Sequence, residues 1–191
     1  LEYGISHYGD HFYIVTNLDA KNFRLMKTPV DATTKDNWEE VIPHRDDVLL
    51  EGIDIFKDYL VVEERQEGLN QIRIKTWDGS KDEYLEFNDP AYTAGTRSNP
   101  DFDTEILRFG YSSMTTPSST YDHNMRTGER ILLKQQEVID DNFSPDNYMS
   151  ERLMVEVRDG VKVPVSMVYR KGTERNGENP FLLYAYGSYG S

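Results

Sequence analysis

Residues 58–64 read Asp58-Tyr59-Leu60-Val61-Val62-Glu63-Glu64, a turn residue followed by the aromatic and β-branched side chains typical of a strand. A similar run, Phe12-Tyr13-Ile14, lies 48 residues before Leu60-Val61-Val62, and three identities share that offset (from 10 to 58, 22 to 70 and 27 to 75). The identical pairs are Asp10 with Asp58, Asn22 with Asn70, and Lys27 with Lys75. A third, weaker copy follows in Leu107–Ser112, Ser119–Asn124 and Arg130–Lys134. The first two thirds of the chain therefore contain an internal repeat of short strands.

The period of this repeat predicts a β-propeller, in which each unit of about 40 to 50 residues forms one four-stranded blade. One such sheet cannot cover its own two faces, so blades stack around an axis and bury each other. We expect about three blades before residue 140. A β-sandwich, whose strands recur every ~8 to 12 residues, is the alternative. The strands expected in the first two copies are Phe12–Thr16, Phe23–Lys27, Trp38–Ile42, Val48–Ile55, Tyr59–Glu64, Gln71–Lys75 and Tyr84–Phe87.

The character of the sequence changes near residue 140. The acidic, Pro-containing segment 140–147 is typical of a linker. Two apolar runs, 151–158 and 161–169, then flank Asp159-Gly160, which is a strong hairpin signal. A polar loop leads to Phe181-Leu182-Leu183-Tyr184-Ala185-Tyr186, which we predict to be a buried strand. The expected fold is mainly β: a partial propeller over 1–140, a linker over 141–149, and the opening strands of an α/β domain over 150–191.

Composition excludes several classes of function. The chain has 191 residues and a formal net charge of −13, which argues against a nucleic-acid partner. No apolar run approaches the ~20 residues of a membrane span. The absence of cysteine excludes a disulfide scaffold, a thiolate zinc site and a cysteine nucleophile, and agrees with a reducing compartment. The chain starts at Leu1 without a leader pattern and stops directly after the expected strand, so we interpret it as an internal piece of a larger protein.

Catalytic and metal-binding motifs are sparse. A nucleophile elbow needs Gly-x-Ser-x-Gly, and Gly110-Tyr111-Ser112-Ser113-Met114 lacks the last glycine. His7 and His11 are four residues apart in what we expect to be one extended segment, where their side chains would lie about 13 Å apart, so we assign no metal. The glycines of residues 184–190 allow a sharp turn close to a ligand, although an aromatic-rich loop that merely packs is the simpler interpretation.

Four strings in order, residues 49–65, 110–117, 158–166 and 184–190, resemble the oligopeptidase B branch of the prolyl oligopeptidase family of serine peptidases. The resemblance covers nearly the whole chain. It implies the last blades of a seven-bladed propeller followed by the opening β-strands of an α/β-hydrolase domain. The Ser-His-Asp triad, and the acidic residues that bind Lys or Arg, would then lie beyond Ser191 in the rest of the parent chain.

The resemblance also implies roles for two tyrosines. Tyr186 matches the tyrosine whose hydroxyl donates to the oxyanion of the tetrahedral intermediate, and Tyr189 matches an aromatic residue that lines the substrate pocket. The implied parent is a cytoplasmic peptidase that needs no cofactor and cleaves short peptides after Lys or Arg. A free-standing propeller-type interaction module that binds basic peptides is the alternative.

Overall fold

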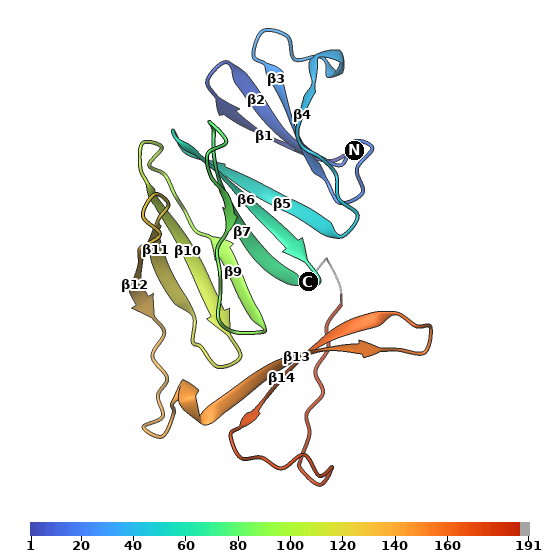
Figure 1. Ribbon diagram of the computed structural model, residues 1–191, viewed down its shortest axis with the longest axis vertical. Helices are drawn as coiled ribbons and strands as arrows, with labels where there is room; N and C mark the ends of the chain where they lie inside the picture. Colours follow the sequence, from blue (N-terminus) through green and yellow to red (C-terminus); the bar gives the residue numbers. More distant parts are fainter. Residues whose placement is uncertain (188–191) are drawn as a thin grey trace.

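The computed structural model describes residues 1–187 and contains strands but no α-helix in that range (Figure 1). Three four-stranded antiparallel sheets follow one another along the chain, each with its strands in sequence order. The first sheet comprises β1 (Tyr3–Tyr8), β2 (His11–Thr16), β3 (Arg24–Pro29) and β4 (Glu39–Ile42). The second sheet comprises β5 (Val48–Ile55), β6 (Tyr59–Gln66), β7 (Leu69–Thr76) and β8 (Asp82–Tyr84). The third sheet comprises β9 (Tyr92–Thr96), β10 (Ile106–Ser113), β11 (Ser119–Asn124) and β12 (Arg130–Gln135).

The matched lysines, Lys27 and Lys75, form equivalent ion pairs in the first and second sheets. Lys27 on β3 forms an ion pair of 3.2 Å with Glu39 on β4. Lys75 on β7 likewise pairs with Asp82 on β8. In both sheets this lysine joins the third strand to the fourth, so the repeat in the sequence is a repeat in the structure.

The sheets pack face to face in succession, and the second is buried on both sides. Leu60 and Val62 on β6 pack with Tyr13, Leu25 and Ile42 of the first sheet. Val61 points the opposite way and packs with Leu107 and Phe109 of the third sheet. Each of these three β6 side chains is at most 2% exposed, and such burial contributes about 1.5–3 kcal/mol per side chain. The propeller-type architecture is therefore confirmed, and the β-sandwich alternative is wrong.

A polar side chain on the second strand of each sheet binds the segment that leads into the first strand of the same sheet. Thr16 Oγ1 donates to the Glu2 carbonyl at 3.1 Å. Glu64 on β6 accepts from Arg45, which precedes β5. The hydroxyl of Tyr111 on β10 donates to Asp89, which precedes β9, at 2.5 Å. These bonds hold the start of each sheet against its centre.

Some local predictions need correction. β1 and β9 were not predicted, because each contains a glycine (Gly4 and Gly95), a residue depleted in strands that weakens the strand pattern. The fourth strand of the second sheet is Asp82–Tyr84 rather than 84–87. His7 and His11 do not share an extended segment: Gly9, with φ +57°, forms a tight turn that places them on adjacent strands and opposite faces.

A short 3₁₀ turn, Pro145–Asn147, precedes a separate hairpin of β13 (Tyr148–Glu156) and β14 (Lys162–Arg170). The hairpin matches its prediction, with Gly160 at φ +81° in the turn. The buried strand predicted at 181–186 is wrong for this chain: residues 181–187 form no strand, and Phe181 and Leu182 are 74% and 89% exposed. A strand needs a neighbour to pair with, and the described residues supply none there. No helix in the described range is long and apolar enough to span a membrane.

Candidate functional site

The hairpin packs against one end of the stacked sheets, at the turn between β6 and β7. Gly68 in that turn has φ +78°, and a Cβ placed on it would lie 3.5 Å from Arg152 Nη2 and 3.6 Å from Pro164 Cγ. Arg152 belongs to β13 and Pro164 to β14, so both hairpin strands touch this turn. Arg152 Nη2 is buried and has no hydrogen-bond partner among the described residues.

A hollow of about 300 Å³ lies beside this contact, between the third sheet and the hairpin. Burial raises the pKa of Tyr92 in its wall, and the positive charge of Arg152 partly opposes that rise. Among residues 1–187 no carboxylate or histidine lines it, so these residues offer hydroxyl groups for hydrogen bonding but no acid–base group. Its lining residues are Ala91, Tyr92, Thr93, Ser112, Ser113, Met114 and Ser166.

The string 110–117, which borders this hollow, is organised by Asp89. Besides the bond from Tyr111, the Asp89 carboxylate accepts from Thr115 Oγ1 at 3.3 Å and Thr116 Oγ1 at 3.2 Å. Burial, followed by the bond to Asp89, raises the pKa of the Tyr111 phenol. Ser113 Oγ accepts from the backbone N–H of Thr116 at 2.9 Å. These contacts shape a turn, and they give Ser112 and Ser113 no general base, in agreement with the missing elbow motif.

A second polar cluster surrounds Glu64, whose side chain is completely buried. Tyr84 Oη donates to Glu64 at 2.5 Å, Arg73 Nη1 lies 3.5 Å away, and Arg45 Nη2 completes the set. The four side chains join β6, β7, β8 and the segment before β5. The cluster is closed to solvent at its centre and fully paired, so it is structural.

Glu63, the neighbour of Glu64, joins the second sheet to the third. Its Oε1 accepts from the backbone N–H of Thr96 on β9 at 2.6 Å. Burial raises the pKa of Glu63, the bond from Thr96 opposes the rise, and the charges of Asp54 and Glu51 add to it. The group is therefore an acceptor placed at the contact between two sheets.

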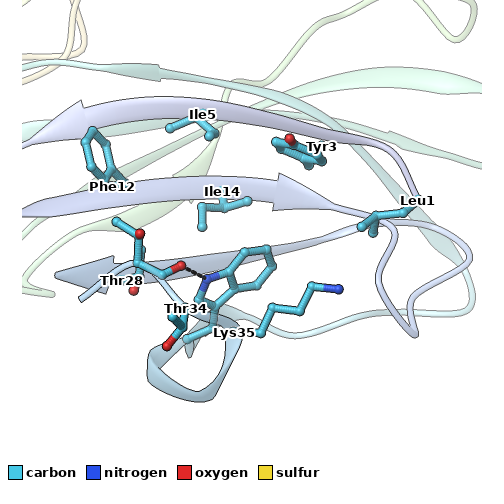
Figure 2. Close-up of a pocket in the computed structure, with 10 residues that line it drawn as sticks. Leu1, Tyr3, Ile5, Phe12, Ile14, Thr28, Thr34 and Lys35 are labelled. Carbon is cyan, nitrogen blue, oxygen red and sulfur yellow. Dashed lines mark hydrogen bonds between the residues drawn. The ribbon is translucent and has the colours of Figure 1, made fainter. Parts of the chain in front are cut away.

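A larger hollow, of about 520 Å³, lies on the outer face of the first sheet (Figure 2). The side chains of Tyr3, Ile5, Phe12 and Ile14 line it, and Trp38, whose Nε1 donates to the Thr33 carbonyl at 3.2 Å, forms one wall. Phe12 and Ile14 occupy the positions that Leu60 and Val62 occupy in the second sheet, where the preceding sheet covers them. The hollow is thus an uncovered packing face rather than a reaction site.

Of the two tyrosines predicted as site residues, Tyr186 is not brought into any of these clusters. Tyr186 lies in the extended segment after the hairpin and is 61% exposed, and its hydroxyl has no partner within residues 1–187. Tyr189 lies outside the described residues. Sequence reasoning missed Asp89, Glu64 and Arg152, because nothing in the local sequence distinguishes these charged residues from solvent-exposed ones.

Comparison with known proteins accounts for the repeated sheets. Residues 1–136 match the family model described as prolyl oligopeptidase, N-terminal beta-propeller domain. The chain belongs to the prolyl oligopeptidase family. Among curated members it is 44% identical over its whole length to dipeptidyl aminopeptidase BI of Pseudoxanthomonas mexicana, and 34% identical over 99% of its length to protease 2 of Moraxella lacunata.

Solved structures of family members have the same fold over most of this chain. Oligopeptidase B from Trypanosoma brucei, with covalently bound antipain, superposes on 99% of the chain with a TM-score of 0.87 at 32% identity. Oligopeptidase B from Leishmania major matches 92% of it with a TM-score of 0.80 at 28% identity. The chain spans about a quarter of the length of the curated relatives, 26% and 27% of the two named above. It also spans 28% and 26% of the two solved chains.

Proposed function

We propose that this chain is part of a cytoplasmic serine-type oligopeptidase that hydrolyses short peptides after Lys or Arg. The observation that carries the proposal is the match over 99% of the chain to an oligopeptidase B structure, together with the four ordered strings that resemble that branch. In this proposal the three sheets are propeller blades that restrict the size of substrates. The hairpin begins an α/β-hydrolase domain whose triad lies outside residues 1–191.

Tyr186 has a chemical role in this proposal. A hydroxyl donor aimed at the oxygen that becomes charged in the transition state is worth about 3 to 4 kcal/mol of barrier in a site that excludes water. In the described residues Tyr186 is exposed and its hydroxyl is unpaired. We propose that the remainder of the hydrolase domain covers this segment and directs the hydroxyl at the substrate carbonyl, while Tyr189 lines the adjacent substrate pocket.

A second candidate activity follows from the name of one relative. The 44% identical protein is a dipeptidyl aminopeptidase, which suggests release of dipeptides from a free amino terminus. An endopeptidase and a dipeptidyl aminopeptidase differ in whether they tolerate a blocked amino terminus. That difference can be measured with matched substrates.

The test uses the full-length protein that contains this chain and four fluorogenic dipeptide amides. They carry Arg or Pro at the cleavage site, each with a free or a carbobenzoxy-blocked amino terminus. The proposed endopeptidase hydrolyses both Arg substrates, blocked or free, at least about tenfold faster than the Pro substrates. Hydrolysis of the free Arg substrate alone would establish the dipeptidyl activity instead. Preference for Pro would refute the Arg or Lys specificity, and the isolated 191-residue chain is expected to hydrolyse none of them.

A further inference from the structure

The outward face of the third sheet differs from the faces that pack inside the array. In the second sheet, Val61 on β6 pairs with Ile74 on β7, and both are buried against the third sheet. The equivalent pair in the third sheet is Arg108 on β10 with Asp122 on β11. An ion pair with a 2.8 Å N–O distance therefore stands where the preceding contact has two aliphatic side chains.

Arg97 adds an unpaired positive charge to this outward face. It directly follows β9, and its backbone N–H donates to the Arg108 carbonyl at 2.9 Å, so the two arginines share a face. The Arg97 guanidinium fills the space that a Cβ would occupy at Gly110 on β10. Among residues 1–187 no carboxylate pairs with Arg97, and the side chain is exposed. Asp122 neutralises Arg108, which leaves this face with a net positive charge in a chain of formal net charge −13.

The contact between the second and third sheets shows what a side chain at the position of Gly110 can contribute. There Glu63, at the position equivalent to Gly110, crosses to the next sheet and accepts from the backbone N–H of Thr96. In the third sheet that acceptor is replaced by glycine, and a cation occupies the space. The polarity of the contact is therefore reversed, so the surface that meets this face has to supply an acceptor for Arg97 rather than a donor.

We propose that the sheet that covers the outward face of the third sheet in the full-length protein presents an Asp or Glu carboxylate to Arg97. The inference rests on the proposed function, in which the chain is part of a longer peptidase with a complete propeller. A planar guanidinium supported on a glycine presents its donors as a fork that suits a carboxylate.

Zero-length carbodiimide cross-linking of the full-length protein tests this pairing. In an Arg97→Lys variant the new amine can form an amide with a carboxylate within ion-pair distance, and peptide mass spectrometry identifies that carboxylate. We expect a cross-link within one polypeptide to an Asp or Glu outside residues 1–191. The matched control is Arg108→Lys, which should cross-link to Asp122. Cross-linking of the control alone, or of the Arg97→Lys amine to residues 1–187 or to a second molecule, would overturn the proposal.

A charge series in the full-length protein gives an independent measurement. If a carboxylate faces Arg97, Arg97→Glu lowers the thermal unfolding midpoint at low salt more than Arg97→Gln does, and high salt reduces the difference. Equal midpoints for the two variants would contradict the proposal. Hydrolysis of the Arg substrates by the wild-type protein is measured separately, so a failed pairing is distinguishable from a failed proposed function.

Discussion

The hydroxyl of Tyr111 donates a 2.5 Å hydrogen bond to Asp89, and this one carboxylate also accepts from Thr115 and Thr116. The contact joins β10 to the segment that leads into β9. The string 110–117 has the appearance of a catalytic motif. The bonds to Asp89 show instead that it holds the start of the third sheet and shapes the turn beside the hairpin.

The first prediction concerns this contact. Tyr111→Phe leaves part of the Asp89 carboxylate without a donor in a half-buried site, so we expect a loss of about 1–3 kcal/mol in the free energy of unfolding. Urea denaturation of the full-length protein measures it. The control is Tyr121→Phe, whose ring stacks on Phe109 with 5.4 Å between centroids and should lose little. Equal stability of Tyr111→Phe and wild type would show that solvent replaces the bond.

The second prediction concerns the buried carboxylate of Glu64. Glu64→Gln leaves Arg45 and Arg73 without their shared negative charge, so we expect a loss of about 3–5 kcal/mol in the free energy of unfolding. Glu40→Gln breaks the ion pair between Arg24 and Glu40, whose N–O distance is 3.4 Å. That pair is partly exposed and should contribute less than about 1 kcal/mol. Similar losses in the two variants, measured by denaturant titration, would rule out a special role for Glu64.

The third prediction concerns His123, which is 4% exposed between the second and third sheets. Burial, followed by the nearby charges of Arg130 and Lys81, lowers its pKa to about 4, while Glu83 partly opposes this. The native state therefore holds the ring neutral, whereas the unfolded chain takes up the proton below its ordinary pKa of about 6.5. Stability should fall as pH decreases from about 6.5 to 4, with this residue accounting for about 2 kcal/mol at pH 5.

His123→Gln isolates that contribution, because every other titratable group remains. The free energy of unfolding, measured at pH 7 and pH 5, should fall by about 2 kcal/mol less in the variant than in the wild type. Parallel losses in the two proteins would mean that His123 titrates normally in the folded state.

The fourth prediction concerns the proposed oxyanion donor. Tyr186→Phe in the full-length protein should lower kcat by about 10² to 10³-fold with little change in KM, because the donor acts mainly on the charged transition state. Steady-state kinetics on the blocked Arg substrate measure both constants. The control, Tyr189→Phe, keeps the aromatic ring and should retain nearly full kcat. A larger loss in the control would place the donor at Tyr189.

The sequence alone determined the repeat, the strands with apolar side chains and the hairpin at Asp159-Gly160, because strand period and turn chemistry are local properties of the chain. The ordered strings also indicated the family. Only the tertiary structure decided which charged residues become structural. Arg45 lies 19 residues from Glu64, and Asp89 lies 22 residues from Tyr111. In the sequence, many of the 34 acidic residues are equivalent candidates to pair with Arg45 or Tyr111. Sheet packing selects Glu64 and Asp89 because it removes water from these two carboxylates. The prediction of a buried strand at residues 181–186 fails for a related reason. A hydrophobic sequence shows that a segment favours burial, but only a neighbouring part of the fold can supply the surface that buries it.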